Sequence, residues 1–359
     1  MLRLQWFRLW AVACVTGFGL SAAPTAWAKA DLFDDGPPLE ITLTAPFPAL
    51  VKSATSSTNP YPATLTVSDG SGPAQSLPIE LSPRGMTRRT GGYCRFPPLA
   101  LKFDKASAHG TIFHGQHKLK LVTYCRPGDD YEQRIVLEYL AYRLFNVITP
   151  MSYRVRAAEV TYRNADGKGE ALRRFGFVIE DVDDMAGRND RDRLEAASKQ
   201  VRPARMDAKA AARAALFEYM IGNLDWDFLA GAPGAPCCHN SRLIAGRDAK
   251  PESADGVVPV PYDFDYSGLI DAPYADVPEG LPVQRVTDRL YRGYCVSRAE
   301  LPAVVEEYRA HRAELAAVIA GEPHLNPAFR ARASAYLDGF FKVLDDPGRV
   351  QRDIVGHCR

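Results

Sequence analysis

Apolar and polar residues alternate along most of the first half of the chain. The runs "LEITLTA" (39–45) and "ATLTVSD" (63–69) follow this pattern, and three further runs between 77 and 124, "LPIELSPRG", "PPLALKFD" and "HKLKLVTY", are separated by Gly or Pro. A period of two is typical of half-buried strands. We therefore expect edge strands over 29–75, followed by an antiparallel sheet.

The period changes to that of a helix at residue 129. In "DDYEQRIVLEYLAYRLFNV" (129–147), Ile135, Leu140 and Leu144 fall on one helical face, and acidic residues occupy the first turn. This pattern predicts a helix with a favourable charge at its N-terminus. Two more strand-like runs follow and are separated by the turn "NADGKG" (164–169).

Beyond residue 190 the pattern is mainly helical. Helices are predicted over 205–221, ending at Gly222, and near 298–320 and 327–345. They enclose a small hairpin formed by "SRLIAG" and "GVVPVPYDFD". The order of elements predicts an α+β chain with a sheet-rich front and a helical back.

Composition narrows the class of protein. The chain has 359 residues, of which 46% are hydrophobic, so it can bury a large core. Its 44 basic and 43 acidic residues give a net charge of +1, which provides no bulk electrostatic attraction to nucleic acid or to an anionic membrane. We expect a globular monomer that does not bind nucleic acid.

The first 28 residues have the features of a signal peptide. Arg3 and Arg8 precede an apolar stretch over 9–22, and Ala26-Trp27-Ala28 is a small-x-small cleavage site. We expect cleavage after Ala28 and a periplasmic or secreted protein. The alternative is an uncleaved anchor, although the apolar stretch is shorter than a spanning helix requires. No later segment is long and apolar enough to span a membrane.

Six cysteines follow the predicted cleavage site: Cys94, Cys125, Cys237, Cys238, Cys295 and Cys358. An even number in an exported chain indicates disulfides. The repeated "YCR" beside two strand-like runs favours a bond between Cys94 and Cys125. Because neighbouring cysteines bridge each other with difficulty, we expect Cys237 or Cys238 to pair with Cys295 or Cys358. Zinc binding by Cys237, Cys238 and His239 is an alternative, although these consecutive residues lack the usual ligand spacing.

Carboxylates and carboxamides gather after two regular elements. The helix ending at Gly222 leads to Asp225 and, further on, to Asn240, while the strand "VPVP" leads to Asp263 and Asp265. Such hard oxygen ligands suit Mg²⁺ or Mn²⁺ with phosphate oxygens, and a free carboxylate can accept a hydroxyl proton. The same spacing also fits aspartates that only cap turns.

An ordered set of motifs resembles the spore-coat CotH kinase-like family. The set is "SPRG" (82–85), "LALKFD" (99–104), "HKLKLV" (117–122), "QRIVLEYLAYRLF" (133–145), "FGFVIEDVD" (175–183), "GNLDWD…HNSRLI" and "PYDFDYSG". It covers about residues 40–270, and its order rather than any single motif carries the resemblance. The resemblance implies a two-lobed, atypical protein-kinase-like fold, distantly HipA-like, with a β-rich N-lobe and a mainly helical C-lobe.

The same resemblance implies roles for the polar residues near the expected metal. Asp225 matches the catalytic base, Asn240 the metal-binding Asn and Asp263 the principal metal ligand, with Asp265 as a possible second ligand. Asp225 and Asn240 are 15 positions apart, whereas protein kinases place the equivalent pair about five apart. The intervening residues must therefore form a loop.

Nucleotide contacts are implied elsewhere. Lys102 matches the phosphate-contacting lysine, with Lys120 as the alternative, and Glu138 matches its ion-pair partner, with Glu132 as the competitor. Arg84 matches an Arg-Gly turn.

Glu180 and Asp181 match the adenine contact, and a Gly-rich phosphate loop is missing. These charged residues also fit an ordinary solvated surface.

Together these features predict a signal peptide (1–28), a β-rich extension (29–75), a sheet region with one long helix (76–190) and a helical region with the catalytic-type loops (191–359). The expected function is an exported kinase-like phosphotransferase that moves a phosphoryl group from Mg²⁺-bound ATP, or another nucleoside triphosphate, to a protein hydroxyl. The alternatives are transfer of AMP and a catalytically inactive envelope or surface binding module. The sequence does not identify the protein substrate or envelope partner.

Overall fold

The computed structural model describes residues 31–70, 72–90, 92–195, 200–232 and 235–359. Contacts join Asp31–Arg359 into one compact unit. The predicted signal peptide, 1–28, lies outside the described residues.

The strands are β1 Leu39–Ala45, β2 Tyr61–Ser68, β3 Gln75–Pro83, β4 Leu99–Phe103, β5 Lys118–Val122, β6 Val155–Asn164, β7 Leu172–Ile179, β8 Arg191–Leu194, β9 Ser241–Gly246 and β10 Val258–Pro261. The α-helices are α1 Phe47–Ser53, α2 Thr87–Thr90, α3 Lys105–Ala108, α4 Asp129–Ile148, α5 Val182–Arg188, α6 Ala208–Ile221, α7 Leu301–Ala310, α8 Arg312–Ala320, α9 Pro327–Leu344 and α10 Pro347–Arg349. Short helical turns cover Pro203–Arg205, Cys295–Glu300, Val350–Ile354 and Val355–His357.

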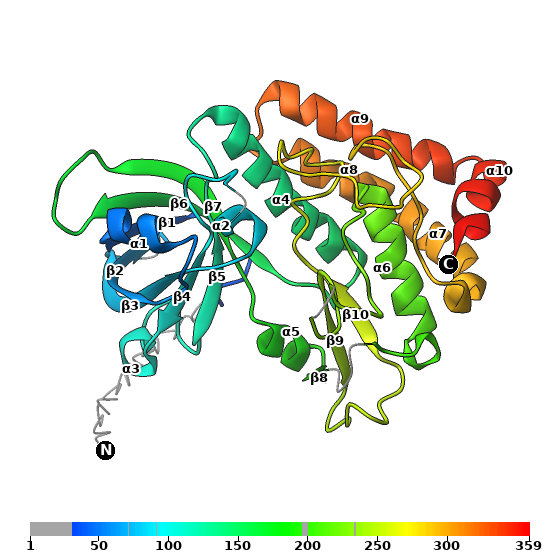
Figure 1. The fold of residues 1–359 in the computed structure, drawn as a ribbon, viewed down its shortest axis with the longest axis horizontal. Helices are drawn as coiled ribbons and strands as arrows, with labels where there is room; N and C mark the ends of the chain where they lie inside the picture. Colours follow the sequence, from blue (N-terminus) through cyan, green and yellow to red (C-terminus); the bar gives the residue numbers. More distant parts are fainter. Residues whose placement is uncertain (1–30, 71, 91, 196–199, 233–234) are drawn as a thin grey trace, which may run out of the picture. The chain divides into compact units, whose positions relative to one another are not determined.

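Seven strands form a closed barrel in the order β1, β2, β3, β4, β5, β7, β6 (Figure 1). Its neighbours are antiparallel except β1 and β6, which run parallel with Leu39 opposite Ala158 and close the ring. The inward-facing residues of β1, Leu39, Ile41 and Leu43, are fully buried in the barrel core. The alternation in the sequence therefore marks the inner face of a barrel.

This architecture contradicts the expected two-lobed, protein-kinase-like α+β fold with a β-rich N-lobe and a mainly helical C-lobe. The structure is instead a closed seven-stranded barrel with mixed helices and a small sheet, in which β10, β9 and β8 are neighbours in that order. The runs 39–45 and 63–69 were predicted to be edge strands, but β1 and β2 each have a partner on both sides. Periodicity shows which face of a strand is buried, and it does not reveal the partner that removes an edge.

Several local predictions are confirmed. Helix α4 covers the segment predicted from its helical period, and the turn at 164–169 joins the antiparallel strands β6 and β7. Helix α6 ends at Gly222, which has a left-handed φ of 66°. A Cβ there would lie 2.0 Å from the Tyr336 hydroxyl. Glycine is therefore favoured both by the left-handed conformation and by the lack of space for a side chain.

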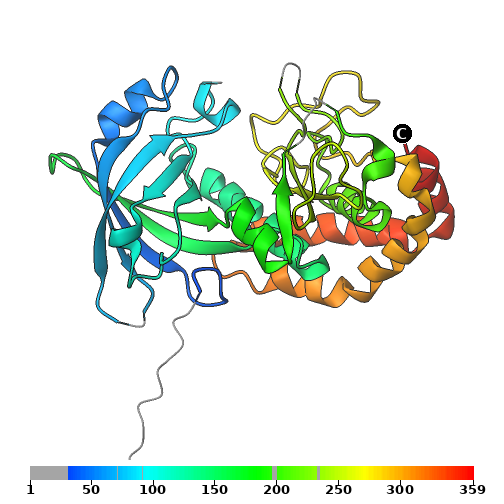
Figure 2. The ribbon, with the colours of Figure 1, turned by 90° about the horizontal axis from the view of Figure 1, so that it is seen from below.

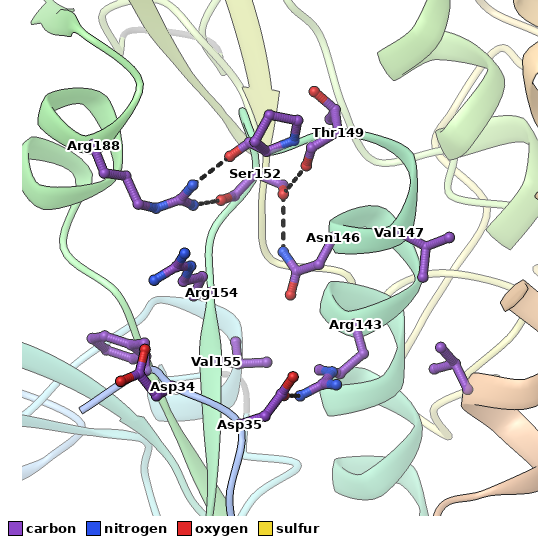
Figure 3. Close-up of a pocket in the computed structure, with 13 residues that line it drawn as sticks. Asp34, Asp35, Arg143, Asn146, Val147, Thr149, Ser152, Arg154, Val155 and Arg188 are labelled. Carbon is purple, nitrogen blue, oxygen red and sulfur yellow. Dashed lines mark hydrogen bonds and ion pairs between the residues drawn. The ribbon is translucent and has the colours of Figure 1, made fainter. Parts of the chain in front are cut away.

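Helix α4 connects the barrel to the C-terminal helices. It contacts β6 and β7 on one side and α8 on another, and Figure 2 shows it between the barrel and the helices. Its apolar residues share one core cluster with those of α6, α7 and α9. Within the described ranges, we find no helix with the length and apolarity needed to cross a bilayer.

Three disulfides join the six cysteines. Cys94 pairs with Cys125, as predicted. Cys237 pairs with its neighbour Cys238, so the expectation that one of them bonds Cys295 or Cys358 was wrong. Cys295 and Cys358 are brought together by backbone hydrogen bonds of Arg359, which donates to Gly293 and accepts from Cys295. Disulfides of this kind are compatible with export.

The two long-range disulfides should account for a measurable part of the stability. Their sequence separations are 63 for Cys295–Cys358 and 31 for Cys94–Cys125. Because each restricts a long loop in the unfolded chain, replacing both cysteines of a pair with Ala is expected to lower the free energy of unfolding by about 4 kcal/mol, slightly less for the shorter loop. Urea unfolding followed by circular dichroism measures this. An equal loss for Cys237→Ala/Cys238→Ala, with a separation of 1, would contradict the loop-entropy argument.

Candidate functional site

The four residues predicted to act in catalysis or metal binding lie around one cavity of about 140 Å³. Asp225, Asn240, Asp263 and Asp265 line it together with Arg84. The four come from the segment after α6, the residue directly before β9 and the segment after β10. The structure thus brings together side chains that are up to 40 positions apart.

The pairing of β9 with β10 explains how two of these segments meet. The strands are antiparallel, with Ser241 opposite Pro261, so the start of β9 lies beside the end of β10. The Tyr262 amide donates to the Asn240 carbonyl at 3.1 Å and extends the pairing by one step. Asn240 and Asp263 are consequently held at the same end of the small sheet.

Asp225 is held by three neighbouring polar groups. Its Oδ1 lies 2.7 Å from His239 Nε2, and its Oδ2 accepts a hydrogen bond from Asn240 Nδ2 at 2.9 Å. The Asp225 amide donates to Asn223 Oδ1 at 3.0 Å. The hydrogen bond to Asp225 raises the pKa of His239. The carboxylate is therefore fixed in orientation yet remains partly exposed, with lone pairs left for a further proton.

Asn240 and Asp263 both adopt left-handed backbone conformations, with φ of 48° and 65°. Asn and Asp tolerate this region better than other non-glycine residues. The Asp263 amide donates to the Tyr142 hydroxyl at 3.0 Å, which ties this turn to α4. The two turns therefore place the Asn240 carboxamide and the Asp263 carboxylate at the cavity.

Arg88 is the central cation of the site, and sequence reasoning missed it. It is buried, its Nη2 lies 2.9 Å from both oxygens of Glu138, and its Nε lies 3.1 Å from Asp265 Oδ2. Asp263 is more distant, at 3.8 Å, and more exposed. Arg88 Nη1 has no hydrogen-bond partner among the described residues.

One guanidinium therefore faces three carboxylates. Burial raises the pKa of Asp265 to about 7 even though Arg88 opposes the shift. Burial likewise raises the pKa of Glu138, again against the effect of Arg88. Burial thus favours the protonated forms of Asp265 and Glu138, whereas Arg88 favours their charged forms.

A basic group lies next to the carboxylates. The Lys120 ammonium is 4.6 Å from the centre of the Tyr262 ring, and Arg242 is 4.9 Å from the same centre. Burial, with the positive charges of Arg84 and Arg242, lowers the pKa of Lys120 to about 7, while Asp263 acts in the opposite direction. Lys120 and Arg242 do not line the cavity themselves, but Lys120 interacts through its charge with Arg84 and Asp263, which do.

Other predicted residues lie elsewhere. Lys102 does not line the cavity and pairs with Glu80 at 2.8 Å on the barrel surface. Glu180 is buried and is bound by Arg188 at 2.8 Å and by the Arg154 amide at 2.9 Å.

Glu138 lies beside Arg88 and not beside a lysine. Its predicted competitor, Glu132, accepts from the Phe175 amide and lies 3.4 Å from Arg174. Of the two lysines considered, Lys120 is the one near the cavity residues.

The donor set fits a hard divalent cation that keeps other ligands. Among the described residues, no three His, Cys, Asp or Glu side chains are grouped so as to hold a metal by themselves. Mg²⁺, however, usually takes only one or two carboxylates and completes its shell with water and phosphate oxygens. Asp263 and the Asn240 carboxamide are the ligands that the geometry leaves accessible, because Asp265 is engaged by Arg88 and by the Tyr274 hydroxyl.

The missed residues left little signal in the sequence. Arg88 belongs to the run "RRT", where nothing distinguishes it from the exposed arginines of the chain. His239 was considered only as a zinc ligand, although its position directly before Asn240 could have linked it to Asp225.

Comparison of the chain with protein-family models gives no match, and comparison with curated proteins gives none either.

Arg88 is expected to be essential for stability. Arg88→Met leaves Glu138 and Asp265 buried without their cation, so the free energy of unfolding should fall by about 3–5 kcal/mol. Adding Glu138→Gln should recover part of the loss, because one buried carboxylate is then removed. Arg285→Met, which breaks an exposed pair with Asp288, is the control and should change little. Urea denaturation of the wild type, Arg88→Met, Arg88→Met/Glu138→Gln and Arg285→Met measures these changes. Equal losses of stability in Arg88→Met and Arg285→Met would contradict the expected role of Arg88.

Lys120 should titrate near neutrality. NMR of ¹³C-labelled lysine side chains is expected to show one group with a pKa of about 7 that disappears in Lys120→Met. Arg84→Gln removes a neighbouring positive charge and should raise this pKa. Since Lys120 is charged below its pKa, inorganic pyrophosphate should bind more tightly at about pH 6 than at about pH 8.5, and Lys120→Met should weaken this dependence. If Arg84→Gln leaves the pKa of Lys120 unchanged, the positive charge of Arg84 does not act on Lys120 as the structure indicates.

Proposed function

We propose that the cavity binds a divalent cation with a nucleoside triphosphate and that the protein transfers a phosphoryl group to a hydroxyl of a protein substrate. The observation that carries this proposal is the convergence of Asp225, Asn240 and Asp263 on one cavity beside a basic group. The proposal rests on these groups and does not depend on a kinase-like fold.

The size of the cavity supports a phosphate-centred ligand. A volume of about 140 Å³ is below the roughly 300–1,000 Å³ of pockets that enclose a whole drug-sized molecule. The cavity accommodates a cation and a terminal phosphate, while the rest of the nucleotide extends beyond it. Arg84 and Lys120 supply the positive charge for the remaining phosphates.

Each residue has a distinct part in this mechanism. Mg²⁺, when bound, neutralises charge on the transferred phosphoryl group and its leaving group. Asp263 and Asn240 would hold the cation, while Arg88 fixes the neighbouring Asp265 through the 3.1 Å ion pair.

Asp225 orients the acceptor hydroxyl and takes its proton. The acceptor oxygen forms the new bond to the γ-phosphorus, the bond to the β-phosphate oxygen breaks, and the nucleoside diphosphate leaves. His239 fixes the rotation of the Asp225 carboxylate through the 2.7 Å contact. Positioning and charge neutralisation provide most of the rate in such reactions.

The direct test is a thermal shift of the mature protein with Mg²⁺ and ATP. At 100 times the dissociation constant, the ligand should add about 2.7 kcal/mol to the stability of the folded state. Asp263→Ala is expected to abolish the shift, whereas Lys102→Ala, on the barrel surface, should retain it. Asp225→Asn should retain the shift and lose transfer.

Mass spectrometry of labelled acceptor protein then separates phosphoryl from adenylyl transfer. If the acceptor protein gains AMP instead of a phosphoryl group, the protein transfers AMP and the phosphoryl-transfer mechanism is wrong. No shift with any nucleoside triphosphate would refute the proposal and favour a binding module without catalysis.

A further inference from the structure

The neighbouring cysteines Cys237 and Cys238 form a disulfide that does little for global stability. Its sequence separation is 1, against 31 and 63 for the other two disulfides. Since a disulfide stabilises mainly by restricting a loop of the unfolded chain, a bond between adjacent residues offers little of this effect. Any benefit of the bond must therefore be local.

Its local surroundings lead directly to the candidate site. Cys238 is followed by His239 and Asn240, and both contact the Asp225 carboxylate, at 2.7 and 2.9 Å. Asn240 also donates to the Asp225 carbonyl at 2.7 Å. The two residues after the disulfide thus hold the group assigned as the base.

The loop carrying the disulfide is closed at its base by a β-bridge. The Asp227 amide donates to the His239 carbonyl at 3.1 Å, and the His239 amide donates to the Asp227 carbonyl at 3.0 Å. Both sulfurs face the carbonyl oxygen of Phe228, at 3.8 Å for Cys237 and 3.1 Å for Cys238. The bonded pair therefore packs against the opposite side of the same loop, one residue from the bridge.

The two sulfurs differ in accessibility. Cys238 is buried, with 7% exposure, whereas Cys237 is half-buried. An incoming thiolate therefore has its approach at Cys237.

We propose that Cys237–Cys238 is a thiol-exchange site, at which reduction by a dithiol loosens the grip of His239 and Asn240 on Asp225. One thiolate of the dithiol bonds to the Cys237 sulfur and displaces the Cys238 sulfur, which takes up a proton. The second thiol of the reagent then attacks the mixed disulfide, releases Cys237 as a thiol and leaves the reagent as a disulfide. The protein gains two electrons and two protons, and the dithiol is oxidised.

The structural consequence follows from the lost covalent link. The two side chains then rotate independently, and the backbone directly before His239 is released from its small ring. The backbone hydrogen bonds of His239 to Asp227 and to Ala230, at 3.0 and 2.9 Å, lie next to this released segment. The effect on catalysis rests on the proposed function, whereas the exchange and the loosening do not.

The experiment uses the full mature protein in graded dithiothreitol. Alkylation followed by peptide mass spectrometry should identify the dithiothreitol concentration at which Cys237 and Cys238 are reduced, and Cys295, which is more exposed than Cys237, is followed in the same samples. Hydrogen exchange of the Asp227 and His239 amides should then rise by about tenfold or more, since these amides form the bridge. The rate of phosphoryl transfer should fall in parallel, because Asp225 is the group assigned as the base.

The matched control is Cys237→Ser/Cys238→Ser, which keeps the other two disulfides. It should show the fast exchange without reductant and no further change in mild dithiothreitol. Unchanged exchange at Asp227 and His239 after the pair is reduced would overturn the proposal. If exchange rises but oxidised protein binds no nucleotide, the thiol-exchange site stands and the proposed function fails.

Discussion

The buried ion cluster around Arg88 is the interaction on which the candidate site depends. Its guanidinium comes from a short helix that follows the barrel strand β3, and it meets a carboxylate of α4 and a carboxylate that follows β10. Three segments far apart in the sequence are thus joined by one side chain in a setting where an unpaired charge is very unfavourable. Removing any one member would leave a buried group without its partner, so the cluster fixes how these three segments pack together.

The local structure could be predicted from the sequence because it follows from short-range rules. The apolar period of 129–147 gives α4, and Gly222 ends α6 in the conformation that glycine favours. The convergence of Asp225, Asn240 and Asp263 was also expected, because each follows or precedes a recognisable element. Their catalytic and metal-binding roles stay predictions.

The rest depends on long-range pairing, which periodicity does not contain. Nothing in "LEITLTA" indicates that β1 lies parallel to β6, so the closed barrel was missed and a two-lobed fold was expected in its place. For the same reason, the sequence did not show which charged side chains lie close together. Lys102 and Lys120 have similar sequence surroundings on adjacent strands, and only the three-dimensional positions of Arg84 and Arg242 show that Lys120 is the one near the carboxylates.

The parallel contact between β1 and β6 also has a kinetic consequence. The two strands are separated by more than 100 residues of chain, so the ring cannot close until nearly half of the polypeptide is present. Contacts of such high sequence separation slow folding, because chain entropy is lost before the contact forms. Until then β1 has an unpaired side that can recruit strands from other molecules. A chain emerging N-terminus first therefore passes through a stage in which protection from aggregation matters more than it does for the finished barrel.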